Sequence, residues 1–333
     1  MATIREVAAR AGVAPITVSR VINGSGYTSE ETRKRVEEAI RELEYVPNVL
    51  ARGLRSRRTH TLGLLVTDVT NPFWTTVARG AEDEAMRAGY ALFLCNTDED
   101  VAKQQRYIHA LLSRRVEGLI IAPASSEAGP LRPVARAGVP FVLVDRRVPD
   151  VAADLVLGDS VAGARLLAEH LLSQGHRRIG HLGGPVGLST ADEREQGYRQ
   201  ALSAAGVEIE PQWVQRGEYK QEAGYRLMQA CLAQPPWPTA VLAANNALAV
   251  GALAALRERG LNVPRDMGLV CFDDVPQASQ IDPFLTVAAQ PAYEFGAVAV
   301  RLLFERLSDP KRPPQTVVLP PELIVRRSAG PLN

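Results

Sequence analysis

The sequence predicts a small all-α head followed by a larger α/β core built on parallel sheets. Apolar residues recur at helical spacing in the first 45 residues, whereas continuous apolar runs alternate with helix-length amphipathic segments from residue 61 onward. Such alternation is typical of βαβ units, and it occurs in two successive blocks. With 333 residues, of which 46% are hydrophobic, the chain is long enough to fill a head and a large or divided core.

The first two predicted helices form a helix-turn-helix over residues 3–23. Thr3 is placed to cap the first helix, Gly12 to end it in the left-handed conformation, and Pro15 to open the second, where a missing N–H costs nothing. The apolar positions of both helices fall on one side. The side chains predicted to face outward from the second helix are Pro15, Ile16, Thr17, Ser19, Arg20 and Asn23.

This outward set suits the DNA major groove. Arg20 can contact guanine or a phosphate, hydroxyl and amide groups can contact phosphates or base edges, and Ile16 can touch a thymine methyl group. A helix pair with a glycine turn also serves as a structural corner, so the pattern alone leaves both interpretations open. The charge distribution suits a head that meets phosphates: residues 1–58 carry 11 Lys and Arg against 7 Asp and Glu, whereas the remainder carries 27 against 30.

A third helix is predicted from Thr28 to Tyr45. Thr28 and Glu31 are spaced as a capping box, and apolar residues at helical spacing would face the first two helices. Residues 47–58 follow as a short basic segment before the first strand, and a solvated linker is one interpretation of it.

The core is predicted to contain two blocks of strands and helices. The strands are expected near residues 62–66, 91–95, 118–122 and 141–144 in the first block and 178–183, 214–216, 240–243 and 268–272 in the second. The helices are expected near residues 73–88, 102–114, 129–137, 161–174, 194–205, 221–233 and 247–259.

Polar and aromatic residues just after the predicted strands are the candidates for ligand binding, because ligands of open parallel sheets collect beyond the carboxyl ends of the strands. These residues, with one on a crossover segment, are Asp68, Asn71, Phe73, Trp74, Asp145, Arg146, Ser189, Thr190, Arg194, Tyr219, Asn246, Asp273 and Gln290. Carboxylates, arginines and amides beside aromatic rings suit an uncharged polyhydroxyl ligand such as a sugar, and stacking also suits a purine. Asp145, Arg146 and Asp273 are alternatively strand-end caps or ion pairs between lobes, and Phe73 is alternatively part of the core.

Other chemistry finds little support in the sequence. Cys95, Cys231 and Cys271 lie far apart among apolar residues, which predicts buried thiols. The five histidines lack metal-ligand spacing, and residues 183–187 lack the Lys-Ser/Thr of a phosphate loop. We therefore expect no metal, no cofactor and no catalytic residue. The sequence shows neither an export signal nor an apolar run of about 20 residues, so a cytoplasmic protein without a membrane partner is expected.

Several motifs occur in a specific order along the chain. In the head they are Thr3-Ile-Arg-Glu-Val-Ala, Ala11-Gly-Val, Thr17-Val-Ser-Arg-Val-Ile-Asn23, Tyr45-Val-Pro-Asn48 and Ala51-Arg-Gly-Leu54. In the core they are Asn71-Pro-Phe-Trp74, Val144-Asp-Arg146, Gly175-His-Arg-Arg-Ile179, Phe272-Asp-Asp274, Gln290-Pro291 and Glu322-Leu-Ile-Val-Arg-Arg-Ser328. With these motifs the chain resembles, over nearly its whole length, the LacI/GalR family of bacterial transcription regulators.

The resemblance implies a domain organisation and a function. It implies a DNA-binding head over residues 1–46, a hinge helix over 47–60 and a periplasmic-binding-protein-like core over 61–333. Lobe one would comprise residues 61–158 and 290–318, and lobe two residues 159–289 and 319–333. The implied function is a transcriptional regulator, a repressor, that binds a palindromic operator in double-stranded DNA as a homodimer and is controlled by a small-molecule effector, a sugar.

The resemblance also assigns roles to individual residues. Thr3 joins the DNA contacts, and the hinge contributes Ala51, Leu54 and Arg55, with Leu54 as a wedge between base pairs in the minor groove. Arg194 and Asp273 match regular effector contacts of the family, and Phe73 and Tyr219 match its stacking positions. Two departures are Ala14, where the family usually has a capping Ser, and Asn246, where it commonly has Asp.

Three alternative functions are consistent with part of the sequence. The effector could be a purine or another metabolite that acts as a corepressor. A solute-binding protein without DNA function would account for the two lobes but not for the basic head. An enzyme on the same framework would need a nucleophile with its base, or a metal cluster, and the sequence shows neither.

Overall fold

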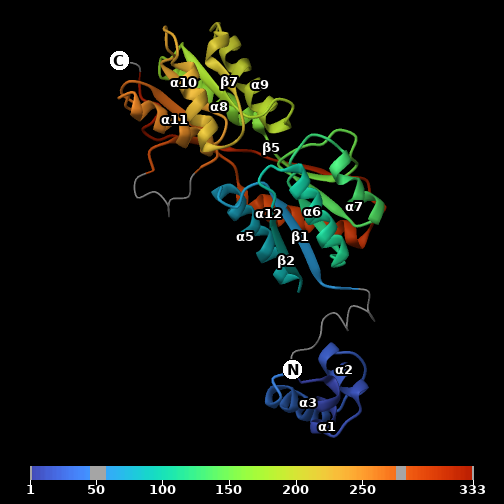
Figure 1. The fold of residues 1–333 in the computed structure, drawn as a ribbon. Helices are drawn as coiled ribbons and strands as arrows, with labels where there is room; N and C mark the ends of the chain where they lie inside the picture. Colours follow the sequence, from blue (N-terminus) through green and yellow to red (C-terminus); the bar gives the residue numbers. More distant parts are fainter. Residues whose placement is uncertain (1, 46–57, 275–282, 332–333) are drawn as a thin grey trace. The chain divides into compact units, whose positions relative to one another are not determined.

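The computed structural model describes residues 2–45, 58–274 and 283–331, which belong to two compact units, residues 1–59 and 60–333. The first unit is a helical head, and the second is an α/β core with two six-stranded sheets (Figure 1). This combination confirms the predicted fold class. Residues 46–57 lie outside the described part of the chain, so the predicted hinge helix is not described.

The head begins with the predicted helix-turn-helix. The helices in its described residues are α1 (Ile4–Ala11), α2 (Pro15–Asn23) and α3 (Glu30–Glu42). The Thr3 side chain accepts a hydrogen bond from the Glu6 amide, and the Glu6 carboxylate accepts one from the Thr3 amide, so α1 starts with a complete capping box. Gly12 ends α1 with a φ of 67°. Ala14 offers no side-chain cap to α2, which starts instead on the preset φ of Pro15.

The predicted cap of α3 is wrong. Ser29, not Thr28, caps this helix, and its Oγ accepts a hydrogen bond from the Thr32 amide at 3.3 Å. Two adjacent hydroxyl residues precede the same acidic first turn, and sequence spacing alone does not decide between them. The helix also ends at Glu42 rather than at Tyr45. Its buried residues pack with α1 and α2 in a small core formed by Val7, Ala8, Ala11, Val18, Val36 and Ala39.

Lobe one of the core is built on a wholly parallel sheet in the order β11-β5-β4-β3-β1-β2. Its strands are β1 (Thr61–Val66), β2 (Ala91–Asn96), β3 (Gly118–Ile121), β4 (Phe141–Val144), β5 (Asp154–Gly158) and β11 (Thr316–Leu319). Its helices are α5 (Pro72–Arg87), α6 (Val101–Ser113), the 3₁₀ helix η1 (Gly129–Leu131), α7 (Arg132–Ala137) and α12 (Ala292–Ser308). Helices α5 and α12 cover one face of this sheet, and α6 and α7 cover the other.

Helices α5 and α12 cross closely because glycines face each other at the crossing. A Cβ atom on Gly80 would lie 2.0 Å from the Tyr293 carbonyl oxygen, and one on Gly296 would lie 1.9 Å from the Val77 carbonyl oxygen. No side chain fits at either position without separating the helices. This close crossing brings the first turn of α5, which carries Phe73 and Trp74, onto the core beside Phe295.

Lobe two repeats the plan with the order β12-β10-β9-β8-β6-β7, in which β12 alone is antiparallel to its neighbour. Its strands are β6 (Ile179–Gly183), β7 (Val214–Arg216), β8 (Ala240–Ala243), β9 (Gly268–Phe272), β10 (Thr286–Ala289) and β12 (Glu322–Ile324). Its helices are α8 (Ser160–Ser173), α9 (Ser189–Ala204), the 3₁₀ helix η2 (Pro211–Trp213), α10 (Gln221–Cys231) and α11 (Asn246–Glu258). Helices α8 and α9 pack on one face and α10 and α11 on the other.

The chain crosses between the lobes three times, after β5, after β10 and after β11. As a result, α12 packs on α5 and β11 pairs with β5 in lobe one, whereas β12 completes the sheet of lobe two. The periodicity did not predict β5, β10, β11 and β12, nor the 17-residue helix α12. It also placed the start of α9 near Arg194, whereas this helix begins five residues earlier, at Ser189, because its first turn is polar.

Candidate nucleic-acid interface and effector cavity

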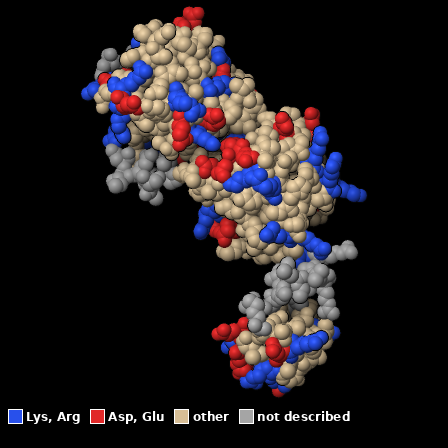
Figure 2. Space-filling view, in the orientation of Figure 1, with Lys and Arg blue, Asp and Glu red and all other residues tan. Residues whose placement is uncertain are grey.

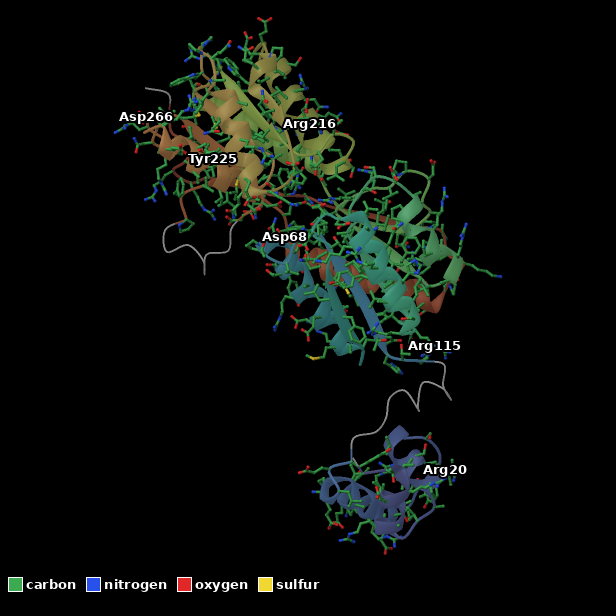
Figure 3. The ribbon with its side chains drawn as sticks, viewed as in Figure 1. Arg20, Asp68, Arg115, Arg216, Tyr225 and Asp266 are labelled. Atoms are coloured by element: carbon green, nitrogen blue, oxygen red, sulfur yellow. The ribbon has the colours of Figure 1, made fainter. Side chains whose placement is uncertain are left out.

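The predicted DNA-reading face of the head lies on α2. Pro15, Ile16 and Arg20 are exposed, with Ile16 47% accessible, and Thr17 and Ser19 are half-buried. Val18 between them is fully buried, which fixes this face of α2 outward. The labelled Arg20 lies at the surface of the head (Figure 3). An exposed helix face with a guanidinium and hydroxyl groups has the chemistry needed to contact phosphates and base edges.

Other predicted DNA contacts are placed differently. The Thr3 hydroxyl donates to the Glu6 carboxylate at 3.0 Å within the capping box, so its proton is already used inside the head. Asn23 ends α2, but its side chain lies outside the described residues, as do Ala51, Leu54 and Arg55.

A cavity of about 180 Å³ lies between the two lobes, where the carboxyl ends of both sheets meet. The predicted site residues that line it are Asp68, Asn71, Phe73, Trp74, Asp145, Arg146, Thr190, Arg194, Tyr219 and Asp273. The labelled Asp68 lies in the region where the lobes meet (Figure 3). The structure thus brings together residues that are more than 200 positions apart in the sequence.

Three predicted residues do not line this cavity. The Ser189 hydroxyl accepts a hydrogen bond from the Arg147 amide at 3.0 Å, a contact between the lobes. Gln290 donates from Nε2 to Asp273 Oδ1 at 2.7 Å and thus holds a lining carboxylate in place. Asn246 is paired with Asn71.

Sequence reasoning missed five lining residues, Thr67, Asp98, Glu99, Lys220 and Asn245. Asp98 and Glu99 lie two and three residues after β2, so applying the strand-end rule to this strand as well could have found them. Asn245 follows β8 by two residues and caps α11, with Oδ1 accepting from the Leu248 amide at 2.9 Å.

Arg146 is a buried cation in the lobe-one wall of the cavity, and its two terminal nitrogens are paired while its Nε atom forms no hydrogen bond within the described residues. Its guanidinium donates two hydrogen bonds to the Glu99 carboxylate, at 2.6 and 2.7 Å, and a third to the Pro123 carbonyl oxygen at 2.9 Å. Asp145 lies 3.5 Å from its Nε atom. This fork-on-fork arrangement neutralises the buried charge within lobe one, so the ion pair does not connect the two lobes.

Arg194, on α9, is a buried cation in the lobe-two wall of the cavity. Its guanidinium carbon lies 3.8 Å from the centre of the Phe272 ring, and Nη1 donates to the Ala244 carbonyl oxygen at 2.6 Å. The distance from Nη1 to Asp273 Oδ2 is 3.8 Å. Its Nε atom is buried and forms no hydrogen bond within the described residues, so it remains available to a ligand.

Two hydroxyl groups are also available to form hydrogen bonds with a ligand. Thr190 Oγ1 and the Tyr219 hydroxyl are buried and form no hydrogen bond of ordinary geometry with the described part of the chain. Burial raises the pKa of the Tyr219 phenol, while Arg194 and the nearby Thr190 hydroxyl lower it. A protonated phenol both donates and accepts, as a hydroxyl-rich ligand requires.

Burial also changes the acidity of the two lining aspartates. It raises the pKa of Asp273 to about 6, although Arg194 and the hydrogen bond from Gln290 act in the opposite direction. Burial raises the pKa of Asp145 as well, against the attraction of Arg146. Acidic side chains gather where the lobes meet (Figure 2), and five lining residues are carboxylates against three cations. The cavity therefore suits an uncharged ligand better than an anion.

The described residues contain no group of three or more His, Cys, Asp or Glu residues that could hold a metal ion. Cys95, Cys231 and Cys271 are free and buried, as predicted. Across the described ranges, no helix has the length and apolar character needed to span a membrane.

Comparisons with known proteins follow the same division into head and core. Residues 3–48 match the family model described as bacterial regulatory proteins, lacI family, and residues 168–329 match that of a periplasmic binding protein-like domain. The ribose operon repressor of Escherichia coli is 38% identical over 331 residues, covering 99% of this chain and 100% of that protein. The HTH-type transcriptional repressor PurR of Pasteurella multocida is 36% identical over 329 residues, covering 98% of both chains.

A solved structure supports the same assignment. The structure of the lac repressor dimer bound to operator and the anti-inducer ONPF has a TM-score of 0.86 and 28% identity, and the match covers 99% of both chains. Helical head, two-lobed core and sequence similarity thus agree over nearly the whole length. The chain belongs to the lacI family of bacterial regulatory proteins and is a DNA-binding transcriptional regulator controlled by a small molecule.

Proposed function

We propose that the protein is a repressor that binds a palindromic operator as a homodimer and is controlled by a sugar bound between the lobes of its core. The evidence for a sugar as the ligand is the set of polar groups that line the cavity. Its two arginines lie beside carboxylates, while Arg194 Nε and the hydroxyls of Thr190 and Tyr219 remain without protein partners of ordinary geometry. These groups suit the donors and acceptors of an uncharged polyhydroxyl molecule.

A purine is less well supported as the effector. Phe73 contacts Trp74 and Phe295 edge to face, with ring centres 4.9 and 5.4 Å apart, and is 6% exposed. Its ring is held in the core of lobe one, and little of its surface faces the cavity. The similarity to the ribose operon repressor makes D-ribose the first ligand to test.

Calorimetric titration of the full-length protein with D-ribose, D-glucose, hypoxanthine and D-ribose 5-phosphate tests the ligand class. We expect one or both uncharged sugars to bind and the phosphate ester to bind far more weakly, because the lining carries an excess of carboxylates. Saturable binding of hypoxanthine alone would overturn the proposal of a sugar.

The homodimer is proposed from the edge of lobe one and from the dimeric lac repressor relative. Strand β2 is an edge strand, and it exposes Phe93 by 43% and Leu94 by 48%. An exposed apolar edge that is left unpaired is a site of association. We propose that this edge packs against a second copy of the chain.

Sedimentation of matched variants tests this surface. Leu94→Glu should shift the protein from dimer to monomer, because a carboxylate would be buried at the interface. Val318 is 49% exposed on β11, the opposite edge of the same sheet, so Val318→Glu is the control and should leave the dimer intact. A dimeric Leu94→Glu protein would place the interface elsewhere.

DNA binding is tested by selecting duplexes from a randomised palindromic library with the full-length protein. We expect the selected duplexes to share two inverted half-sites, because a twofold dimer presents two copies of the α2 face. Selection of single, non-repeated sites would contradict the proposed dimeric binding. The sugar found by calorimetry should then change the affinity for the selected duplex, since a ligand shifts the equilibrium between two states by its differential affinity for them.

A further inference from the structure

Asn71 and Asn246 form a reciprocal amide pair across the cleft. Asn71 caps α5 in lobe one, and Asn246 is the first residue of α11 in lobe two. Asn71 Nδ2 donates to Asn246 Oδ1 at 3.1 Å, and Asn246 Nδ2 donates to Asn71 Oδ1 at 3.0 Å. Two hydrogen bonds therefore join the lobes at one point beside the cavity.

The other hydrogen bonds of the two amides fix how they face each other. Asn71 Oδ1 also accepts from the Phe73 amide at 3.0 Å, so its oxygen must point toward the start of α5. Asn246 Nδ2 lies 3.4 Å from the Asp274 carbonyl oxygen, so its amino group must be on that side. Both N–H donors of Asn246 are thus used by the protein, and little of its hydrogen-bonding capacity is left for a ligand.

The pair lies between two hollows of the cleft. Asn71 lines the inner cavity of about 180 Å³ and an outer cavity of about 500 Å³, whereas Asn246 lines only the outer one. Asp68, Tyr219 and Lys220 also line both. The outer cavity is otherwise formed by Thr70, Pro72, Gln221, Glu222, Ala247 and Val250.

We propose that the Asn71–Asn246 pair is a size filter, which closes the inner cavity on this side and restricts the effector to a free monosaccharide. A glycoside or disaccharide that extends toward the outer cavity would have to break two hydrogen bonds between the buried Asn246 and the half-buried Asn71 and leave these amides unpaired. The proposal rests on the proposed function, because it concerns the sugar bound in the same cavity.

The identity of residue 246 matters to this filter. An aspartate there could accept from Asn71 Nδ2, but its second oxygen would face Asn71 Oδ1 and the Asp274 carbonyl oxygen, where Asn246 presents hydrogen atoms. Acceptors facing acceptors repel, so a carboxylate cannot form the reciprocal pair. The asparagine at this position therefore sets ligand size through its partner rather than by direct contact with the sugar.

Calorimetric titration of the full-length protein tests the filter with D-ribose, D-glucose, their methyl β-glycosides and cellobiose. We expect the wild-type protein to bind a free monosaccharide about 100-fold more tightly than its glycoside or the disaccharide. Asn246→Ala should reduce this ratio to about 10-fold or less, because it removes both hydrogen bonds and widens the passage. Gln221→Ala is the matched control, since Gln221 lines the outer cavity without belonging to the pair, and it should keep the wild-type ratio.

Asn246→Asp is the second variant. It keeps the size of the side chain, so it tests the pairing without creating a cavity, and it should also reduce the ratio; circular dichroism and thermal melting verify that each variant is folded. Equal wild-type affinity for monosaccharides and glycosides, or an unchanged ratio in both variants, would overturn the filter while leaving the sugar site intact. Absence of any sugar binding to the wild-type protein would instead overturn the proposed function and the filter with it.

Discussion

Asp145 and Asp273 occupy equivalent positions in the two lobes. Asp145 follows β4 with a φ of 67°, and Asp273 follows β9 with a φ of 66°. The amide of Asp145 donates to the Val156 carbonyl oxygen at 2.8 Å, and that of Asp273 to the Ala288 carbonyl oxygen at 2.9 Å. Each lobe thus aims one buried carboxylate into the cavity from a left-handed residue at the end of a central strand, a conformation that costs about 1–2 kcal/mol in a residue other than glycine.

Sugar binding should strengthen as the pH rises through about 6. Burial raises the pKa of Asp273 to about 6, and the ionised carboxylate is the better acceptor for a ligand hydroxyl. Titrations with D-ribose or D-glucose between pH 5 and pH 8 measure this dependence, and Asp273→Asn should bind more weakly with a flatter profile. A wild-type affinity that does not vary over this range would show that Asp273 does not accept from the ligand.

The same carboxyl group should make the ligand-free protein less stable toward unfolding as the pH rises, whereas it makes sugar binding stronger. Because the folded pKa is about 6 and the ordinary value is 3.8, the folded state binds the proton more tightly than the unfolded state. Its contribution to the free energy of unfolding is fully present below pH 4 and is lost as the pH rises through 6, by at most about 3 kcal/mol. Urea titrations of wild type and Asp273→Asn, subtracted at each pH, isolate this contribution; a constant difference across the range would contradict it.

His181 should destabilise lobe two in acid. It is fully buried and stacks on Tyr198, with ring centres 5.0 Å apart, and burial together with Arg216, Arg199 and Arg194 lowers its pKa to about 3. As the pH falls below about 6.5, this histidine therefore becomes protonated in the unfolded state but stays neutral in the folded state. The free energy of unfolding should fall by about 1.4 kcal/mol for each pH unit below 6.

Replacing this ring by an apolar side chain tests the effect. Thermal melting of wild type and His181→Leu between pH 4 and pH 7 should show a steeper loss of stability in the wild type as the pH falls. Parallel profiles for the two proteins would indicate that the histidine titrates normally.

Arg20→Ala should weaken binding of the selected operator duplex by about 10- to 100-fold, because a guanidinium that bonds a base edge contributes about 1–3 kcal/mol. Fluorescence anisotropy measures the affinity, and sugar binding to the core should not change. Arg41→Ala is the control: Arg41 is an exposed arginine of α3 rather than of α2, and this variant should lose much less affinity. Equal losses of DNA affinity in the two variants would indicate that Arg20 only attracts the phosphate backbone and does not read a base.

Gly296→Ala should destabilise lobe one by about 1–3 kcal/mol or more, because the added methyl group would lie 1.9 Å from the Val77 carbonyl oxygen and would force α5 and α12 apart. Thermal melting measures the loss. Gly129→Ala is the control, since an added Cβ atom there meets nothing within 4 Å. A Gly296→Ala protein as stable as the wild type would mean that the crossing can widen freely.

The sequence predicted elements whose signal is local and missed those defined by partners far along the chain. The helices of the head carry their caps and apolar stripes within a few residues. Strand β5, in contrast, opens on Asp154, a fully buried carboxylate held by Arg306 and Arg312, and no local pattern reveals these partners. Strand β11 alternates between exposed and half-buried residues at the edge of its sheet, which weakens its apolar signal.

The residues of the candidate cavity were also predictable from the sequence only where their signal is local. Strand-end positions identified both arginines and three of the four lining aspartates, all but Asp98, because the carboxyl ends of parallel strands converge. The pairing of Arg146 with Glu99, 47 positions away, and that of Asn71 with Asn246, 175 positions away, depend on how the lobes fold and meet, and sequence spacing does not contain this information.

The three crossings between the lobes set an order of events during synthesis. Lobe one lacks α12 and its edge strand β11 until residue 319 has left the ribosome, whereas the head is a separate compact unit that ends near residue 59. A nascent chain can therefore complete its head long before either half of the core. For most of its translation the polypeptide would carry a folded DNA-contacting head without the completed core that binds the small-molecule effector.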